Sequence, residues 1–405
     1  MARGSLIVEV YTAESAEPLP NSVVEVFDQN GTLIETTGTD ENGKTPEIPL
    51  VAPEKALSEQ PSSERPYSEY NIIVRNDSFP TITVQNAQVL PDEVSLQNID
   101  MSTLSAHHGS NEIIVNENTL YGDYPPKIPE SEIKDLNTES GYVVLDKPII
   151  PEYVVVHDGS PDSSATDYWI PYSTYIKNVA SSEIYSTWPR ETIKANVIAI
   201  ISFTLNRVYT EWYRSKGKYF TITSSTAYDQ CFRYGRTIYK EISQIVDEVF
   251  STYLTKTGVR QPILTQYCDG VHTSCSNGMS QWGSKYLGDR GYTAIEILRN
   301  YYGSSTYLVT AEQVNGVVMS WPGRVLQQGS RGNDVKTIQT QLTAINKNFP
   351  GIPALNADGI YGPLTRNSVE AFQRAFNLSP TGTVNYSTWY KINQIYVAVK
   401  KLGPQ

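Results

Sequence analysis

The spacing of apolar residues changes along this chain of 405 residues. In the first hundred residues, apolar side chains form short β-branched runs such as 5–10 and 22–27, separated by turn residues, which is typical of β-strands. From Tyr175 onward they recur every three or four positions, which is typical of helices with one buried face. Because the two patterns occupy separate stretches, we expect a multidomain α+β protein.

Charge is also distributed unevenly. The net charge is −11, and counting Lys and Arg against Asp and Glu gives −17 for residues 1–150, 0 for residues 151–323 and +6 for residues 324–405. This asymmetry indicates three units with different partners. Acidic loops that merely aid solubility are the alternative explanation.

Composition argues against several classes of protein. No run approaches the roughly 18 apolar residues of a membrane span, so we expect no membrane partner. The basic tail lacks Lys and Arg clusters, which argues against nucleic acid. The start of the chain shows no signal peptide, because Glu9 interrupts its only apolar stretch. The 28 Tyr against 9 Phe, with 6 Trp, indicate surfaces that stack on polar ligands such as sugars.

The first hundred residues are predicted to form a β-sandwich-like leader. Besides the two runs above, strands are expected at 70–74 and 82–84, with a turn at Asp40-Glu-Asn-Gly43 and a surface loop at 53–66. The layout resembles the carboxypeptidase-regulatory-like β-sandwich over roughly residues 4–100. That resemblance implies a structural module without chemistry of its own.

Residues 101–150 are predicted to be a linker and activation segment. The stretch contains three prolines, many acidic and Asn residues, and the pair His107-His108. The pair has no third metal ligand at a suitable spacing, so we interpret the stretch as solvated. Long irregular segments of this kind are accessible to proteases.

Residues 151–323 are predicted to be a separate domain that begins its helices after Tyr175. Thr187-Trp-Pro-Arg-Glu191 offers a capping hydroxyl, a proline suited to a first turn and an acid near the positive end of the helix dipole. A strand is expected at 262–267, before a compact loop at 268–275. Two apolar stripes lie between these features: Ile193, Val197, Ile200, Ile201, Leu205 and Val208, then Ile238, Ile242, Ile245, Val246, Val249 and Phe250.

Separated motifs in this unit resemble, in the same order, the SpoIID-type domain of peptidoglycan-cleaving proteins. They are Tyr175-Ile-Lys-Asn-Val-Ala-Ser-Ser-Glu183, Trp188-Pro189, Lys194-Ala195, Asp229-Gln230, Gly278-Met-Ser-Gln-Trp-Gly283 and Ile297-Leu-Arg-Asn-Tyr-Tyr-Gly303. Two positions depart from the family: Ile200-Ile-Ser-Phe203 replaces Ala-Arg-Thr-Tyr, and Cys275-Ser276 replaces His-Gly. With the acidic leader and Val154-Val-Val-His-Asp-Gly159, the chain is similar to the SleC-type spore cortex-lytic enzymes of clostridia.

The resemblance implies that Glu183 is the catalytic acid of a lytic transglycosylase. The residues themselves agree with this role, because Glu183 follows three small residues and precedes Ile184, Tyr185 and Trp188, which can supply an apolar setting. Such a setting raises a carboxyl pKa and keeps the group protonated near neutral pH. The alternative is a surface Glu on a helix.

Four further residues are candidates for substrate binding. Asp229 and Gln230 stand where the family keeps a polar pair, and Gln281 and Trp282 lie near the end of the strand-loop element. We expect them to orient sugar hydroxyls and N-acetyl groups, with Trp282 as a stacking platform. A position in the core is the alternative for Trp282.

Cys268, His272 and Cys275 leave two interpretations open. They could bind zinc, with Cys231 as a fourth ligand, although the spacing matches no common zinc pattern. A Cys268–Cys275 disulfide, or free thiols, is the alternative that we rank first. We therefore expect no cofactor, and zinc remains the lower-ranked alternative.

Residues 324–405 resemble the three-helix peptidoglycan-binding module of type 1. Two helical stripes flank a turn, Asp358-Gly-Ile-Tyr-Gly362, in which Asp358, Gly359, Tyr361 and Gly362 are the residues of note, and whose glycines are expected to allow tight backbone geometry. The resemblance implies that this module holds the chain on the anionic cell wall, which raises the local substrate concentration.

Three functions from different classes follow. The first, which we favour, is a lytic transglycosylase zymogen that cleaves spore cortex peptidoglycan during germination and is activated by a subtilisin-like protease cutting within residues 101–150. The second is a non-catalytic wall-binding enhancer of an amidase. The third is a metal-dependent wall hydrolase. The first predicts a location in the cortex and coat region of the spore.

Overall fold

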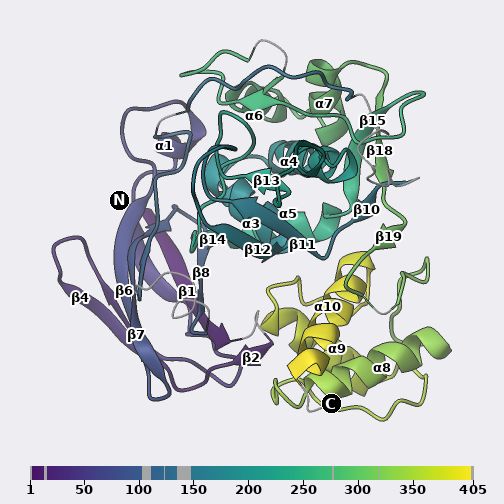
Figure 1. Ribbon diagram of the computed structural model, residues 1–405. Coiled ribbons are helices and arrows are strands. Elements are labelled where there is room, and N and C mark those ends of the chain that lie inside the picture. Colours follow the sequence, from purple (N-terminus) through teal and green to yellow (C-terminus); the bar gives the residue numbers. More distant parts are fainter. Residues whose placement is uncertain are drawn as a thin grey trace.

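The computed structural model describes residues 2–12, 16–102, 111–122, 124–134, 147–275, 278–317 and 319–402, with side chains as far as residue 400. Three parts follow one another along the chain (Figure 1): a leader built of β-sheets, a central domain of helices and short sheets, and a C-terminal group of three helices. The predicted α+β multidomain class is therefore confirmed. No helix in these ranges is long and apolar enough to cross a membrane.

The leader contains two five-stranded sheets over one apolar core. Alternate residues of strands such as β1, whose Leu6, Val8 and Val10 are buried, face this core, as period-2 strands require. The first sheet has the order β14-β8-β1-β2, with β5 also paired to β1, and the second has the order β4-β3-β6-β7-β9. The strands of the first sheet are β1 (Ala2–Thr12), β2 (Glu17–Pro18), β5 (Ile48–Ala52), β8 (Val94–Asp100) and β14 (Ile238–Tyr239). Those of the second are β3 (Val23–Phe27), β4 (Leu33–Gly38), β6 (Ser68–Asn76), β7 (Phe79–Val89) and β9 (Glu112–Ile114).

Two strands of these sheets come from outside residues 1–100. β14 belongs to the central domain and pairs antiparallel with β8, while β9 pairs in parallel with β7. Covering a sheet edge in this way removes a row of unpaired backbone groups. The leader therefore shares its sheets with other parts of the chain and is not an independent domain.

The central domain is arranged around α4 (Arg190–Tyr209), which is buried on nearly every side. The sequence predicted a one-sided stripe, but other elements surround this helix (Figure 1). The helices around it are α3 (Tyr172–Glu183), α5 (Lys240–Val249), α6 (Gln281–Gly288) and α7 (Ala294–Tyr302). Short sheets complete the domain: β11 (Tyr153–His157) with β12 (Asp167–Pro171) and β13 (Ile222–Thr223), β15 (Thr252–Lys256) with β18 (Thr306–Thr310), β16 (Tyr267–Cys268) with β17 (Met279–Ser280), and β10 (Ile149–Ile150) with β19 (Gln313–Val314).

Two local predictions in this domain are wrong. The strand expected at 262–267 is restricted to β16, and residues 262–266 run without regular structure. Thr187 does not cap α4, because its hydroxyl donates to Ser58 Oγ of the leader. Ser58 lies in the short helix α1 (Ala56–Glu59), within a stretch predicted to be a surface loop, and it is fully buried.

Residues 111–122 and 124–134 correct the prediction of a solvated linker. Leu120, Tyr124 and Lys134 are buried, and the chain between them runs along the central domain with alternating exposed and covered residues. His107 and His108, and residues 135–146, lie outside the described residues. We call residues 118–122 and 124–134 the strap.

The C-terminal part is the predicted three-helix module. α8 (Asn333–Ile345), α9 (Pro363–Ala375) and α10 (Tyr386–Leu402) enclose a core that includes Trp389 and Phe372. The module also contacts both other parts. Asn348 Nδ2 donates to the carbonyl of Ala16, and Tyr386 Oη hydrogen-bonds with Ser251 Oγ at 2.7 Å.

Candidate active site around Glu183

Glu183 is the last residue of α3, and none of its surface is exposed. The helix stops there because Ile184 turns to an extended conformation (φ −137°, ψ 167°), while its N–H still bonds to the carbonyl of Ala180. The small residues Ser181 and Ser182 before it are also fully buried, which lets neighbouring segments approach this helix end closely. The predicted burial of Glu183 is therefore present.

Hydrogen bonding leaves half of the carboxyl group of Glu183 unsatisfied. Oε1 accepts a bond of 2.7 Å from the backbone N–H of Cys231. Oε2 has no hydrogen-bond partner of normal geometry among the described residues. An unpaired oxygen in a buried site disfavours the carboxylate form, because a buried charge requires partners.

Burial raises the pKa of Glu183, which is the direction predicted from sequence. The Lys127 ammonium opposes this most strongly, and the Tyr267 hydroxyl, the Cys231 N–H and the Arg233 charge also lower the pKa. Burial raises the pKa of Tyr267 and of Tyr124 as well, and the nearby charge of Glu183 adds to both effects. The acid role of Glu183 stays a prediction.

Sequence reasoning missed the residues closest to this acid. It named Ile184, Tyr185 and Trp188, whereas the hydroxyl of Tyr267 and the ammonium of Lys127 act on the carboxyl. Tyr267 was within a predicted strand, and its place beside the cysteine loop was the available signal. Lys127 was within the supposed linker and gave no signal.

Strap residues close over the end of α3. Asn118 Nδ2 donates to the carbonyls of Ser181 (3.2 Å) and Ile184 (3.3 Å), and the Thr119 N–H donates to Ser182 O at 2.9 Å. These bonds use the free carbonyls that every helix end leaves. The strap is therefore bonded to the helix end that carries Glu183.

Asp229 and Gln230 do not act as the predicted substrate-binding pair in this structure. Asp229 Oδ1 accepts from Arg207 Nε at 2.7 Å, and its Oδ2 accepts from Tyr213 Oη and from the N–H and hydroxyl of Thr223. All four side-chain bonds of Gln230 also stay inside the domain, to Tyr175 Oη, Thr204 Oγ1, Ile200 O and Tyr267 Oη. Because their polar atoms are already paired, both residues stabilise the loop that carries Cys231.

Gln281 and Trp282 are buried at the start of α6. Trp282 packs against Trp188 and Tyr185, with ring centroids 5.0 and 6.2 Å apart, and is 8 % exposed. It therefore occupies the core, the alternative left open above, and presents no stacking face to solvent. Neither polar atom of the Gln281 amide has a partner among the described residues. Its role in substrate binding stays a prediction.

Sterics explain why a glycine occupies position 278, in the motif that contains Gln281. A Cβ there would lie 2.2 Å from the carbonyl oxygen of Gln266, so only glycine lets β17 lie beside the 266–268 segment.

Cys268 and Cys275 form a disulfide across the 268–275 loop, with their Cα atoms 5.6 Å apart. Asp269 closes the same loop by accepting bonds from the N–H and Nδ1 of His272 and from the N–H of Thr273. In this form neither sulfur is a thiolate, so the alternative zinc set of Cys268, His272 and Cys275 is not available. Among the residues that the structure describes, no group of three His, Cys, Asp or Glu side chains is placed to hold a metal ion.

A second cluster, around His157, has the composition of a nucleophile, a base and an orienting acid. His157 Nδ1 lies 2.7 Å from Asp167 Oδ1, and its Nε2 lies 3.1 Å from the carbonyl oxygen and 3.3 Å from the hydroxyl oxygen of Ser163. The Ser163 hydroxyl also donates to Ser160 O at 2.7 Å. Because the imidazole bonds to the backbone of Ser163 and the hydroxyl donates to Ser160, these bonds fasten the 158–166 loop.

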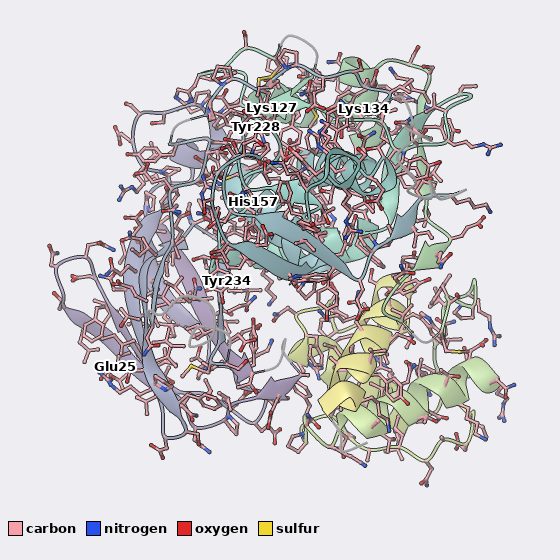
Figure 2. The ribbon with its side chains drawn as sticks, in the orientation of Figure 1. Glu25, Lys127, Lys134, His157, Tyr228 and Tyr234 are labelled. Atoms are coloured by element: carbon pink, nitrogen blue, oxygen red, sulfur yellow. A yellow bond between two sulfur atoms is a disulfide. The ribbon has the colours of Figure 1, made fainter. Side chains whose placement is uncertain are left out.

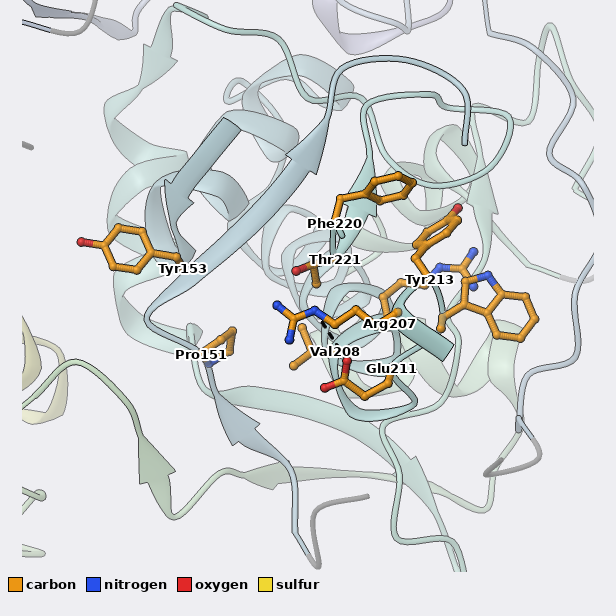
Figure 3. A pocket seen from close by; sticks show the side chains of 10 residues that line it. Pro151, Tyr153, Arg207, Val208, Glu211, Tyr213, Phe220 and Thr221 are labelled. Atoms are coloured by element: carbon orange, nitrogen blue, oxygen red, sulfur yellow. Dashed lines mark ion pairs between the residues drawn. The ribbon is translucent and has the colours of Figure 1, made fainter. Parts of the chain in front are cut away.

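The cavity beside Arg207 is also too small for a glycan. Arg207, Tyr213 and Phe220 help to line it (Figure 3), and its volume is about 110 Å³. Ligand pockets usually measure about 300–1,000 Å³.

One glycine in the turn of the C-terminal module has the backbone conformation that the prediction requires. Gly359 has a φ of +74°, and Asp358 Oδ1 accepts from the N–H of Ile360. Gly362 corrects the prediction, because its φ of −93° is open to any residue. Tyr361 is 1 % exposed and donates to Gly382 O, so it supports the fold of the module.

Two stretches of the chain match known protein families. Residues 165–255, which include Glu183, match the stage II sporulation protein family (SpoIID), and residues 331–392 match the peptidoglycan binding domain family. These two family matches support a role at the cell wall, and the match over residues 331–392 supports peptidoglycan as a ligand of the C-terminal module.

One curated relative is similar over a shorter stretch. The zinc D-Ala-D-Ala carboxypeptidase of Streptomyces albus G is 35 % identical over 77 residues. That match covers 19 % of this chain and 28 % of the relative.

Proposed function

We propose that the protein is a peptidoglycan lytic transglycosylase that cleaves the glycan strands of the spore cortex. The observation that carries the proposal is the carboxyl group of Glu183, which is fully buried, has a raised pKa and lies inside the region that matches the SpoIID family. A carboxyl group that stays protonated near neutral pH is suited to donate a proton to a leaving group.

Glu183 performs both proton transfers of the reaction. As the acid, it gives its proton to the glycosidic oxygen while the bond from that oxygen to C1 of the muramic acid breaks. As the resulting carboxylate, it takes the proton of the muramic acid C6 hydroxyl, whose oxygen then bonds to C1. The products are a free sugar hydroxyl and a 1,6-anhydro ring, and no water is consumed.

One carboxyl group suffices because the nucleophile belongs to the substrate. Ordinary glycosidases need two carboxyl groups on opposite sides of the bond. Asp229, two residues before Cys231, is committed to Arg207, Tyr213 and Thr223 and is not free for a second role. This commitment supports a mechanism with a single acid.

The proposal includes a zymogen that is held inactive until it is cut. Two observations support it: the strap bonds to the helix end that carries Glu183, and the leader shares its sheets with residues on both sides of the strap. Cutting by a subtilisin-like protease within residues 101–150 would activate it during germination, which places the protein in the cortex and coat region of the spore.

The test compares wild-type protein with Glu183→Gln on purified cortex fragments after proteolytic activation. Glutamine keeps the size of the side chain but cannot exchange a proton. We expect soluble fragments with 1,6-anhydromuramic ends from the wild type, and at least a 100-fold loss of them from the variant, since acid–base catalysis contributes about 10²–10⁴-fold. Equal release by both proteins would overturn the proposal. Release only after an amidase is added would favour the enhancer function.

A further inference from the structure

The strap is held by side chains of the central domain that bond to its backbone. Gln266 Nε2 donates to Ile128 O at 2.8 Å, and its Oε1 accepts from the N–H of Glu130 at 3.3 Å. Gln261 makes the same pair of bonds farther along, to the carbonyl (2.9 Å) and N–H (3.1 Å) of Lys134. Each glutamine thus pairs with one backbone N–H and one backbone C=O, which belong to two neighbouring peptide groups.

Both glutamines are buried where they meet the strap. Gln261 and Gln266 are 6 % and 7 % exposed, and they lie on the irregular stretch 261–266, whose Leu264 N–H donates to Glu132 O. If the strap leaves, Gln266 loses both of these bonds and Gln261 keeps only the bond from Asn206 Nδ2, which is costly unless a ligand replaces the strap. The N-acetyl group of an amino sugar carries one N–H and one C=O, the two kinds of group that these glutamines bind.

Aromatic rings lie beside the same path. The Lys127 ammonium lies 5.0 Å from the centroid of Tyr267 and 5.6 Å from that of Phe203, and it also donates to the carbonyls of Thr226 and Asp229. The Lys127 ammonium and the Tyr267 hydroxyl both lower the pKa of Glu183. Aromatic side chains with a few placed polar groups are typical of ligand sites.

Charged contacts hold the strap at its other end. Glu130 accepts two bonds from Arg207, at 2.9 and 2.6 Å, and also pairs with Lys134, while Glu132 pairs with Lys256 at 2.6 Å. Lys127 and Lys134 lie on the same side of the central domain (Figure 2). The strap is therefore fixed from Glu183 to the far end of the 261–266 stretch.

We propose that the strap occupies the glycan-binding groove as an internal substrate mimic, and that Gln266 and Gln261 bind N-acetyl groups of the glycan after it leaves. This inference rests on the proposed function, because it assigns the groove of the same active site. The side chain of Lys127 blocks the position next to Glu183. Replacing Lys127 and Glu130 by smaller residues releases the strap.

The test measures binding and opening in full-length chains that carry Glu183→Gln, so that turnover plays no part. Strap-released chains carry Lys127→Ser and Glu130→Ser in addition. Hydrogen exchange of residues 118–134 reports opening, and titration with tetra-N-acetylchitotetraose reports binding. The C-terminal module is present in every chain, so its own binding cancels between the closed and the released forms.

We expect strap release to raise exchange in residues 118–134 and to raise affinity for the acetylated tetramer at least 10-fold. Adding Gln266→Leu should remove most of this gain, while Gln29→Leu on the exposed leader should not. The de-acetylated tetramer should bind the released chain no better than the closed one.

Three results would overturn the inference: unchanged exchange in the strap, an open strap without a gain in affinity, or a gain that Gln266→Leu leaves intact. Retained secondary structure by circular dichroism guards against a folding defect. If the binding results hold but Glu183→Gln still releases anhydro ends from cortex, the groove assignment survives and the proposed catalytic role fails.

Discussion

At the scale of single residues, the molecule places one carboxyl group where its charged form is disfavoured. Glu183 is fully buried at a helix end to which Asn118 and Thr119 of the strap bond, and among the described residues its Oε2 has no hydrogen-bond partner. Such burial lowers the stability of the fold, and proteins retain buried groups of this kind at functional sites. The loss of stability can be measured without an assay of activity.

The stability of the full chain should therefore depend on pH through Glu183. The pKa is raised in the folded state, so its protonated form is favoured there, and stability falls as the pH rises above the ordinary value of 4.5. Glu183→Gln removes this loss, so near pH 7 the variant should be more stable than wild type, by about 2 °C or more in Tm. Near pH 4 the two should melt together. Thermal melts across this range check the prediction, and a variant that is less stable at pH 7 would contradict it.

At the scale of elements, the disulfide closes the loop that follows Tyr267. A bridge of this loop length stabilises a fold by about 2 kcal/mol, because it limits the unfolded chain. We expect Cys268→Ser with Cys275→Ser to lower the free energy of unfolding by that amount in urea. Titration of denatured, unreduced protein should find one thiol, that of Cys231. Three titratable thiols would show that the bridge is absent.

The sequence predicted the elements well where their pattern was local. Four strands of the leader (β1, β3, β6 and β7), the burial of Glu183 and the C-terminal helices followed from periodicity or from motifs, whereas β2, β4, β5 and β8 were not predicted. The strap was missed because distant partners hold it in place. Its prolines and acids resemble a solvated linker, and the sequence does not reveal partners such as Arg207, Gln261 and Gln266. The internal partners of Asp229 and Gln230 were not foreseen for a related reason, since a polar pair in a sequence does not reveal buried partners.

At the scale of the whole molecule, the leader is fastened to the central domain by a site that is sensitive to pH. Burial raises the pKa of Glu93, just before β8, to about 7. The charge of Glu241 in α5 acts in the same direction, as does that of Asp92, while the Ser186 hydroxyl and the Lys55 charge oppose it. A proton bound at Glu93 therefore stabilises the docked leader.

Docking of the leader should weaken as pH rises from 4.5 through 7, because Glu93 then loses its proton in the buried contact. Glu93→Gln should keep the contact stable at pH 8, by on the order of 1 kcal/mol. Hydrogen exchange at β8 and β14 measures this, with the exposed Glu35→Gln as a matched control. Identical exchange in wild type at pH 6 and pH 8 would contradict the prediction.

The central claim is that Glu183 works without a water nucleophile, and it is tested most directly by the origin of oxygen in the new glycan ends. Cortex is digested by the activated protein in heavy-oxygen water, and the released fragments are analysed by mass spectrometry. The account predicts 1,6-anhydromuramic ends that contain no heavy oxygen, because the C6 hydroxyl of the substrate forms the new bond. Reducing ends that carry heavy oxygen from the solvent would contradict it.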